Sequence, residues 1–208
     1  MEPKERILAS AEASFLRYGI RSISMDDIAA QLGMSKKTLY KFYADKDDLV
    51  SEVVRNHMSC IETDCNADQL TAKDAVHEIF IVLARMAEQY QTINPMVMHD
   101  LQKFHPRAFA LFLKHKSEFL FTVIKNNIER GIKEGLYRED IDVEIMSRFR
   151  LEAMMMPLNP DVFPSSKFSF SKTSQIITEN FIYGLATIKG HELINQYKSQ
   201  VQINNSIL

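Results

Sequence analysis

The sequence predicts an all-α protein whose first part contains a helix-turn-helix. Three observations support this fold class. Apolar residues recur at helical spacing along most of the chain, and no segment alternates apolar and polar residues as a half-buried strand does. The stretch from Ser24 to Tyr43 has the pattern of two short helices around a glycine turn. We therefore expect about nine helices and no internal repeats.

Length and composition are those of a globular protein with one domain or two small ones. The chain has 208 residues, of which 46 % are hydrophobic and 25 % charged, and its net charge is −2. This balance excludes a protein that is basic throughout. Any binding of nucleic acid must come from a local patch, and the cluster Lys36, Lys37, Lys41 and Lys46 is one. Without a signal peptide or a long uncharged apolar run, the chain is predicted to be cytoplasmic and to stay out of membranes.

The cysteines and histidines do not form a recognisable metal site. Cys60 and Cys65 provide no disulfide framework. His57 and Cys60 are three residues apart on one predicted helix, a spacing that allows them to face the same way, as metal ligands would. No Cys-x-x-Cys pair and no other obvious ligands stand beside them, so we interpret both as structural. We expect neither a metal nor a cofactor.

The first helix is predicted to begin near Pro3, a residue favoured at the first helical position, and to end at Gly19. Its apolar residues share one face, which can pack on the helix-turn-helix; they are Ile7, Leu8, Ala11, Phe15 and Tyr18. We expect this helix to act as a brace.

Capping signals define the two helices of the helix-turn-helix. Ser24 is a predicted N-cap, with Asp27 at the third helical position, where its carboxylate can reach back to the cap. Gly33 ends this helix where the backbone must take positive φ. Ser35 then caps the second helix, whose buried face contains Leu39.

The second helix carries the clearest chemistry. Lys36 and Lys37 lie in its first turn, where cations oppose the helix dipole unless an anion such as a DNA phosphate lies in front of them. Thr38, Tyr40 and Lys41 share its outward face, and such a helix fits the major groove of B-DNA. The alternative is a plain solvated surface, because helical hairpins with a glycine turn also occur in proteins that never contact DNA.

A family resemblance begins at this motif. The sequence ISMDDIAAQLGMSKKTLYKFYADKDDL, with KERILASAEASFLRYGI before it, resembles the DNA-binding segment of TetR/AcrR-family transcriptional regulators over roughly the first 55 residues. The resemblance implies that Thr38, Tyr40 and Lys46 contact phosphates and that early residues of the second helix contact bases. Phe42 stands where many members have histidine, and its ring cannot donate that hydrogen bond. The implied DNA-binding set is Ser24, Ser35, Lys36, Lys37, Thr38, Tyr40, Lys41 and Lys46.

The chain after the helix-turn-helix is predicted to be helical to its end. Asp45 caps a fourth helix, and polar residues near Asn66 and Asp68 predict the boundary between a DNA-binding domain, 1–65, and a second domain, 66–208. The further predicted helices span about Thr71 to Gln91, Met96 to Phe104, Arg107 to Arg130, Val143 to Met156 and Ser174 to Ile188, and the tail from about Gln200 to Leu208 is predicted to fray.

The resemblance implies that the second domain binds an effector and dimerises. Methionine and aromatic residues suit a pocket for a hydrophobic small molecule, although a plain helical core uses the same residues. The pocket candidates are Met86, Tyr90, Met98, Phe104, Phe109, Phe121, Phe149 and Met154. The segment ENFIYGLATIKG resembles the dimerisation helix of the family, which implies an interface of Ile177, Phe181, Gly184, Leu185 and Ile188.

Together these features predict a homodimeric regulator of transcription, most simply a repressor released from a palindromic operator on double-stranded DNA by a small hydrophobic effector. The main alternative is a helical enzyme or carrier with an incidental helix-turn-helix. No nucleophile–base pair, P-loop or dinucleotide fingerprint supports catalysis, so we predict that the protein is not an enzyme. A scaffold that binds only protein would show no salt-sensitive affinity for DNA.

Overall fold

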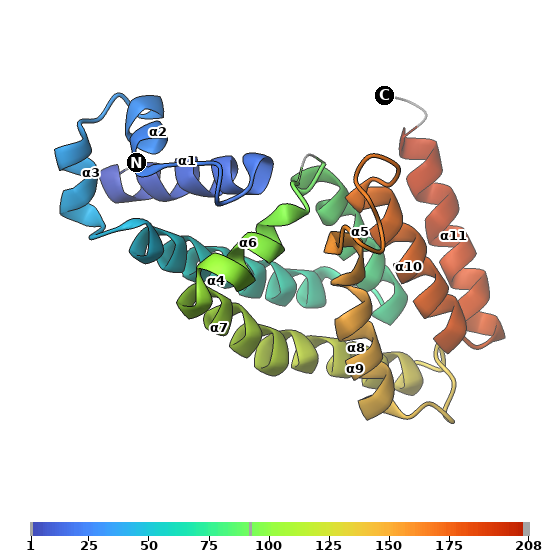
Figure 1. Cartoon of the computed structure of the whole chain (residues 1–208). Helices are drawn as coiled ribbons and strands as arrows, with labels where there is room; N and C mark the ends of the chain where they lie inside the picture. The colour runs from blue at the N-terminus through green and yellow to red at the C-terminus, as the bar shows by residue number, and fades with distance from the viewer. Residues whose placement is uncertain (1, 92, 206–208) are drawn as a thin grey trace.

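The structure is a computed structural model that describes residues 2–91 and 93–205 (Figure 1). It confirms the predicted all-α fold, since the only β-type pairing in these ranges is one isolated bridge between Tyr137 and Ala186. None of the described helices is both long and apolar enough to cross a bilayer. The first four helices are α1 (Pro3–Tyr18), α2 (Met25–Gln31), α3 (Lys36–Phe42) and α4 (Lys46–Thr71).

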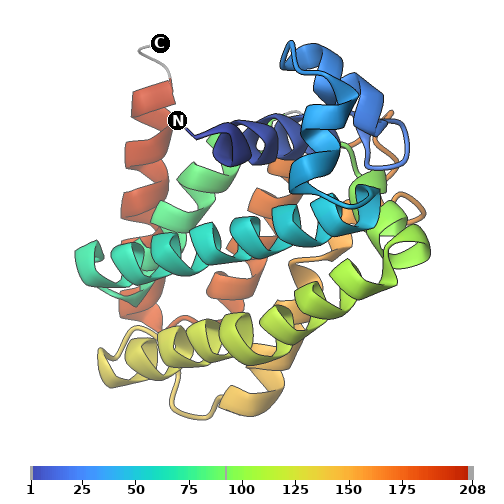
Figure 2. The same cartoon turned by 90° about the vertical axis from the view of Figure 1, so that its left-hand side faces the viewer.

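The remaining elements form the larger part of the molecule. They are α5 (Ala75–Gln89), α6 (Met96–Phe104), α7 (Pro106–His115), the π-helical turn η1 (Lys116–Leu120), α8 (Phe121–Lys133), α9 (Val143–Ala153), the 3-10 turn η2 (Met156–Leu158), α10 (Phe170–Leu185) and α11 (Ile188–Asn205). The helices α2 and α3 stand at one end of the molecule and α11 at the other (Figure 1). Between them α4 runs alongside the α7–α8 segment (Figure 2).

Two apolar cores hold the chain together. The first contains Ile7, Ile28 and Leu39 from the helix-turn-helix unit, but it continues without interruption into Leu101 of α6 and Phe112 of α7. The second joins α5, α8, α10 and α11, with Val76, Phe80, Ile128, Tyr137, Phe181, Ile182, Leu185 and Ile194 among its members. The helix-turn-helix unit therefore shares its core with the middle of the chain.

Helix α4 is longer than predicted. It passes through Asn66 and Asp68 and ends at Thr71, so these polar residues do not interrupt it. Asn66 is exposed, and Asp68 is buried in an ion pair with Arg85 of α5. A polar residue opposes a helix when the helix would bury it without a hydrogen-bonding or charged partner. Asn66 is exposed to solvent and Asp68 has a partner, so neither residue opposes the helix. The next helix, α5, begins at Ala75, where Asp74 accepts the N–H of His77 at 2.7 Å, and not at Thr71.

The end of the chain differs most from the prediction. Helix α10 begins at Phe170, earlier than the predicted Ser174, because Ser169 provides the N-cap. It ends at Leu185, and a further helix that the sequence analysis did not predict, α11, follows from Ile188. The predicted fraying from Gln200 falls partly within α11, and residues 206–208 lie outside the described ranges.

Two loops lock α8, α10 and α11 together. The main-chain N–H of Arg138 donates to the carbonyl of Leu185 at 2.9 Å, and the N–H of Thr187 donates to the carbonyl of Leu136 at the same distance. Gly190 in α11 packs so closely on this pairing that a Cβ atom there would lie 2.1 Å from the Leu136 oxygen. Only glycine fits at this position.

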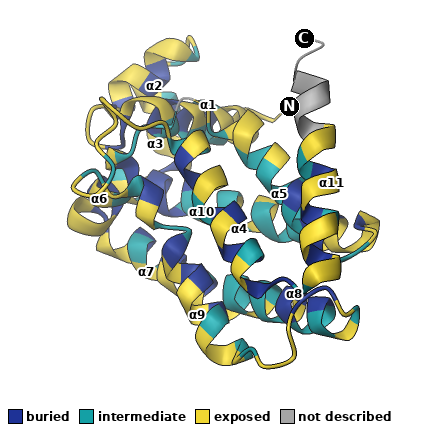
Figure 3. Cartoon of the chain, turned by 90° about the vertical axis from the view of Figure 1, so that its right-hand side faces the viewer, coloured by how far each residue is buried: buried dark blue, intermediate teal, exposed yellow. Residues whose placement is uncertain are grey.

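The predicted dimer residues are divided between core and surface. Phe181 and Leu185 are buried inside the subunit, 7 % and 1 % exposed, because α5 and α11 pack on α10. The prediction that they face a partner is therefore wrong. Ile177 is half-buried, while Gly184 and Ile188 are exposed. The outward side of α11 carries mostly exposed residues (Figure 3).

Another apolar surface is open to solvent instead. Ile145 and Phe149 of α9 are 62 % and 57 % exposed, and Ile176 of α10 is 49 % exposed. The ring of Phe149 stacks on that of the buried Phe181, with centroids 6.2 Å apart. We call the exposed residues Ile145, Phe149, Met156, Ile176 and Gly184 the α9–α10 face.

Candidate DNA-binding surface and internal cavity

The helix-turn-helix has the capping that the sequence predicts. The Ser24 hydroxyl accepts the N–H of Asp27 at 3.1 Å, and the Asp27 carboxylate accepts the N–H of Ser24 at 2.8 Å. The Ser24 hydroxyl donates to the Asp27 carboxylate at 2.6 Å, and this bond together with that from the Ser24 N–H holds the pKa of Asp27 below its usual value. Gly33 has φ +62°, and Ser35 accepts the N–H of Thr38 at 3.1 Å to start α3. Each helix of the motif therefore begins at a side-chain cap encoded in the local sequence.

Helix α3 presents several of the predicted DNA contacts to solvent. Lys37 and Lys41 are exposed and form no ion pair with any residue that the structure describes. Tyr40 is 49 % exposed and Phe42 is 40 % exposed, so both rings stand on the outside of the motif. Lys36 is also exposed but pairs with Asp26 of α2, which raises the pKa of its ammonium group.

Lys46 is placed differently from the other lysines. Its ammonium group is half-buried and donates to the main-chain carbonyl of Ile20 at 2.6 Å. Burial lowers the pKa of Lys46, and the carboxylates of Asp100, Asp47 and Asp27 oppose that shift. In this conformation Lys46 points to the turn between α1 and α2, and it would have to leave Ile20 to reach a phosphate.

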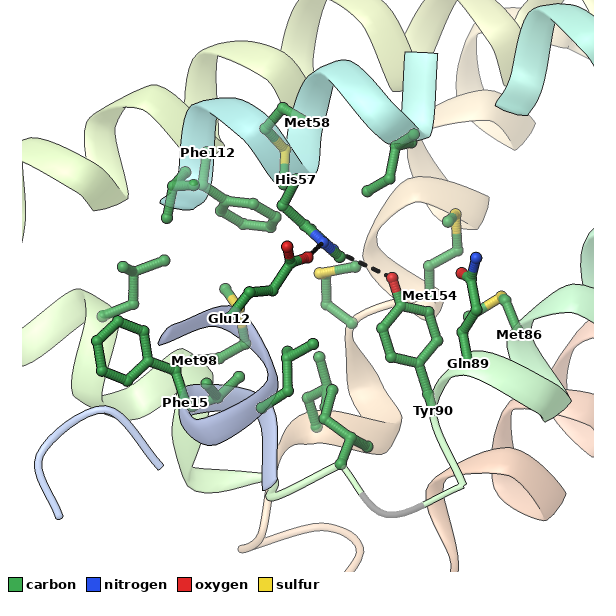
Figure 4. A pocket seen from close by; sticks show the side chains of 18 of the residues that line it. Glu12, Phe15, His57, Met58, Met86, Gln89, Tyr90, Met98, Phe112 and Met154 are labelled. Atoms are coloured by element: carbon green, nitrogen blue, oxygen red, sulfur yellow. Dashed lines mark hydrogen bonds and ion pairs between the residues drawn. The ribbon is translucent and has the colours of Figure 1, made fainter. Parts of the chain in front are cut away.

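A cavity of about 240 Å³ lies between the helix-turn-helix unit and the rest of the chain. Its walls come from α1, α4, α5 and α6, with further residues from α7, η2 and α10. Most of the lining is apolar, and Figure 4 shows Phe15, Met58, Met98 and Phe112 turned toward the space. Because Phe15, Leu16 and Ile20 belong to α1 or follow its end, the brace helix that packs on the helix-turn-helix forms one wall.

The predicted pocket residues separate into two groups. Met86, Tyr90, Met98 and Met154 line the cavity. The other four are phenylalanines that lie outside it, in different places. Phe109 packs behind the lining residue Phe112 with ring centroids 6.2 Å apart, Phe121 lies under the guanidinium of Arg148, Phe104 is 37 % exposed beneath Arg21, and Phe149 belongs to the α9–α10 face.

A chain of three polar side chains crosses one side of the cavity (Figure 4). His57 Nδ1 lies 2.5 Å from Glu12 Oε1, and His57 Nε2 lies 3.1 Å from the hydroxyl of Tyr90. The three residues come from α1, α4 and the end of α5, so the chain connects the brace helix to α4 and α5. We call it the Glu12–His57–Tyr90 chain. Burial raises the pKa of Tyr90 to about 12, so its hydroxyl stays protonated.

Further polar contacts join α6 and α7 to the helix-turn-helix unit. Asp100 of α6 accepts the main-chain N–H of Arg21, and the N–H of Asn94 donates to the carbonyl of Leu16 at 2.7 Å. At the start of α7, His105 pairs with Asp47 in the first turn of α4. A movement of α6 would be transmitted to both ends of the motif through these bonds.

Comparison with known proteins assigns this architecture. Residues 7–53 match the sequence profile described as bacterial regulatory proteins of the tetR family. Over 108 residues the chain is 32 % identical to the uncharacterised HTH-type transcriptional regulator YvaF of Bacillus subtilis, an alignment that covers 50 % of this chain and 55 % of YvaF. These matches support a TetR-family transcriptional regulator. The chain is also 22 % identical over 149 residues to the repressor KstR2 of Mycobacterium tuberculosis, covering 69 % of this chain and 73 % of KstR2.

Solved structures share the fold over nearly the whole chain. The reduced form of E. coli NemR superposes with a TM-score of 0.74 at 11 % identity, covering 89 % of this chain and 98 % of NemR. A transcriptional regulator of Saccharomonospora viridis in complex with choline gives a TM-score of 0.70 at 19 % identity, with coverages of 88 % and 97 %.

Sequence analysis did not find two parts of the cavity. Glu12 was not recognised, and His57 was noticed only for its spacing from Cys60. The contribution of Phe15, Leu16 and Ile20 was also missed, because an apolar stripe on a first helix looks the same whether it covers a core or a cavity. The pairing of Glu12 with His57 joins residues 45 positions apart, which no local pattern reveals.

Proposed function

We propose that this TetR-family regulator is a repressor that binds an operator as a homodimer and leaves it when a small, largely apolar molecule occupies the cavity. The observation that carries this proposal is the position of the cavity. Its wall includes Phe15, Leu16 and Ile20, so a bound molecule would touch α1, the brace helix that packs on α2. A ligand shifts a conformational equilibrium only through differential contacts, and here those contacts would act on the helix-turn-helix through α1.

DNA binding would use the exposed side of α3. Lys37, Tyr40 and Lys41 are accessible there, and Ser35 and Thr38 lie in its first turn. Early residues of a recognition helix reach base edges, while lysines and hydroxyls further along contact phosphates. We divide the chain functionally into a DNA-binding part, residues 1–65, and an effector-binding and dimerising part, residues 66–208, with α4 passing from one to the other.

Dimerisation would use the α9–α10 face in place of the buried side of α10. Ile145, Phe149 and Ile176 present apolar surface that the subunit leaves open, and exposed patches of this kind mark protein interfaces. Gly184 at one end of the face lets a second backbone come close. A stable twofold interface buries at least about 1,000 Å² in total. Because a twofold dimer presents two equivalent α3 helices, the operator should be an inverted repeat.

Named relatives support both halves of the proposal. KstR2 of Mycobacterium tuberculosis is named a transcriptional repressor, and its solved structure, with a TM-score of 0.63 at 18 % identity, is described as a ketosteroid transcriptional regulator. The Saccharomonospora viridis neighbour was solved with choline. The choline complex supports a small-molecule site in a protein of this fold.

In vitro selection from a random duplex library tests the DNA part of the proposal. The regulator should enrich an inverted repeat whose affinity falls steeply with salt, because bound phosphates release counterions. Enrichment of sequences without twofold symmetry would contradict a dimeric repressor. Equal affinity for all sequences would contradict readout by α3.

A further inference from the structure

The Glu12–His57–Tyr90 chain separates two hollows. On its inner side lies the cavity of about 240 Å³, and on its outer side a groove of about 560 Å³ that is lined by Ala9, Ala13, Arg17 and Cys60. Glu12, His57 and Tyr90 line both spaces. A molecule that entered the cavity from this groove would pass these three side chains and could keep its polar end beside them.

The protonation of each group determines which atoms of the Glu12–His57–Tyr90 chain can donate or accept a hydrogen bond. An ionised Glu12 carboxylate only accepts, so the proton between it and His57 lies on Nδ1. When the imidazole is neutral and carries its proton on Nδ1, Nε2 accepts and the Tyr90 hydroxyl donates to it. The Tyr90 oxygen can then accept a hydrogen bond from a ligand hydroxyl. Alternatively, the Tyr90 hydroxyl can rotate away from His57 and donate its hydrogen bond to a ligand carbonyl.

The charge around the cavity disfavours anions. Besides His57, Cys65 and Tyr90, its ionisable lining consists of three carboxylates, Glu12, Asp64 and Asp68, and one guanidinium, Arg85. Arg85 is already paired with both aspartates, at 3.1 Å to Asp64, so it is not free to receive a ligand carboxylate or phosphate. An anion would enter a region of low polarity and net negative charge without a counter-ion, which is costly.

Size and wall chemistry restrict the ligand further. An apolar cavity of about 150 Å³ holds a single benzene ring, so about 240 Å³ corresponds to roughly ten to fifteen non-hydrogen atoms. Aromatic rings and methionines surround this space, and the ring of Tyr90 itself packs edge-on against Phe170 of α10 with centroids 5.8 Å apart.

We propose that the cavity binds an uncharged one- or two-ring molecule whose single hydroxyl or carbonyl group hydrogen-bonds to Tyr90 at the Glu12–His57–Tyr90 chain. This inference rests on the proposed function and specifies the chemical class of its effector. It also names the contact through which the effector reaches the DNA-binding unit, because a ligand that takes over the Tyr90 hydroxyl loosens the link between α5 and Glu12 of α1.

Calorimetric titration with three probes that share the naphthalene body tests the inference. The probes are 1-naphthol, 1-methylnaphthalene and 1-naphthoate, titrated into the full-length wild type, Tyr90→Phe and the control Tyr197→Phe. Tyr197 is also buried and bonds a carboxylate, Asp74, at 2.7 Å, but it does not line the cavity. The Tyr197→Phe variant therefore reports the loss of a buried hydroxyl elsewhere in the fold.

We expect 1-naphthol to bind the wild type about three- to tenfold more tightly than 1-methylnaphthalene, the range that one neutral hydrogen bond provides. Tyr90→Phe should remove that advantage and leave 1-methylnaphthalene unchanged, while Tyr197→Phe should leave both affinities unchanged. The anion 1-naphthoate should bind more weakly than both. The inference is overturned if 1-naphthoate binds as tightly as 1-naphthol, if Tyr90→Phe weakens both neutral probes equally, or if 1-naphthol does not bind.

Operator affinity measured with and without 1-naphthol separates this inference from the proposed function. Tyr90-dependent binding of 1-naphthol with lowered operator affinity supports both. The same binding with unchanged operator affinity supports the ligand class but overturns release by an effector. Normal operator binding by a protein that does not bind 1-naphthol overturns the ligand class alone.

Discussion

Asp100 of α6 accepts a hydrogen bond from the main-chain N–H of Arg21, in the turn between α1 and α2, at 2.9 Å. Asp100 is only 5 % exposed, so this bond connects α6 to the turn that leads into the helix-turn-helix, away from water. Asp100→Ala should lower the free energy of unfolding by about 1–3 kcal/mol, because the Arg21 N–H loses its partner. Urea unfolding measures the change. Asp100→Asn keeps an acceptor oxygen and should lose less, and equal losses in the two variants would contradict this role.

A second prediction concerns Lys46 and the DNA backbone. Lys46→Ala should weaken binding to specific and non-specific duplexes about equally, and should reduce the slope of log affinity against log salt by about one. Fluorescence anisotropy over a salt series measures both quantities. Lys73→Ala, an exposed lysine beyond the far end of α4, is the matched control and should bind as wild type. An unchanged salt slope for Lys46→Ala would mean that Lys46 stays on Ile20 in the complex.

A third prediction concerns Lys37, whose substitution should change sequence preference, in contrast to that of Lys46. Lys37 is exposed in the first turn of α3, where side chains reach base edges. Lys37→Ala should therefore change which sequences are enriched in a selection experiment, with a discrimination loss of about 1–3 kcal/mol at one position. A selection that returned the wild-type sequence logo would place Lys37 on the backbone instead.

Dimer assembly is tested on the α9–α10 face. Phe149→Glu should yield a folded monomer in sedimentation velocity, because the side chain is open in the subunit but would become a buried, unpaired charge in the interface. Ile188→Glu is the control: this residue is 83 % exposed at the start of α11, and its variant should remain a dimer. The reverse pattern, with Phe149→Glu dimeric and Ile188→Glu monomeric, would place the interface on α11.

Acid stability should depend on His115. Burial lowers the pKa of His115, the charge of His57 adds to this effect, and Glu62 at 3.5 Å opposes it. Because the folded state binds the proton less readily than the unfolded state does, stability should fall as pH drops below about 6.5, the ordinary histidine value. His115→Phe should reduce the slope of unfolding free energy against pH between about pH 6.5 and 5 by up to one proton. An unchanged slope would assign the acid sensitivity to other groups.

Local signals predicted the N-terminal half of the fold well. The caps at Ser24, Ser35 and Asp45 and the positive φ of Gly33 are properties of a few neighbouring residues, so they can be recognised without knowledge of the tertiary structure. Helix α6 was predicted with the bounds that the structure shows, since prolines stand just outside both of its ends.

Tertiary packing explains what sequence analysis missed. Helix α11 has few apolar residues and contains Gly190, so no clear stripe indicated it, yet Ile194 and Tyr197 hold it in the second core. The apolar sides of α10 were recognised, but periodicity does not tell which side is covered by the same subunit. For the same reason Met86 and Phe121 looked equally suited to a pocket, and only the arrangement of helices places one in the cavity and the other under Arg148.

The uninterrupted first core has a consequence for chimeras. A fragment of residues 1–65 would keep Ile7, Ile28 and Leu39 but would lose Leu101 and Phe112, which belong to the same core. We expect this fragment to expose apolar surface and to aggregate. A chimera that joins residues 1–65 of this protein to the second domain of another TetR-family regulator would also need α6 and α7 of this protein. These helices lie more than 30 residues further along the chain.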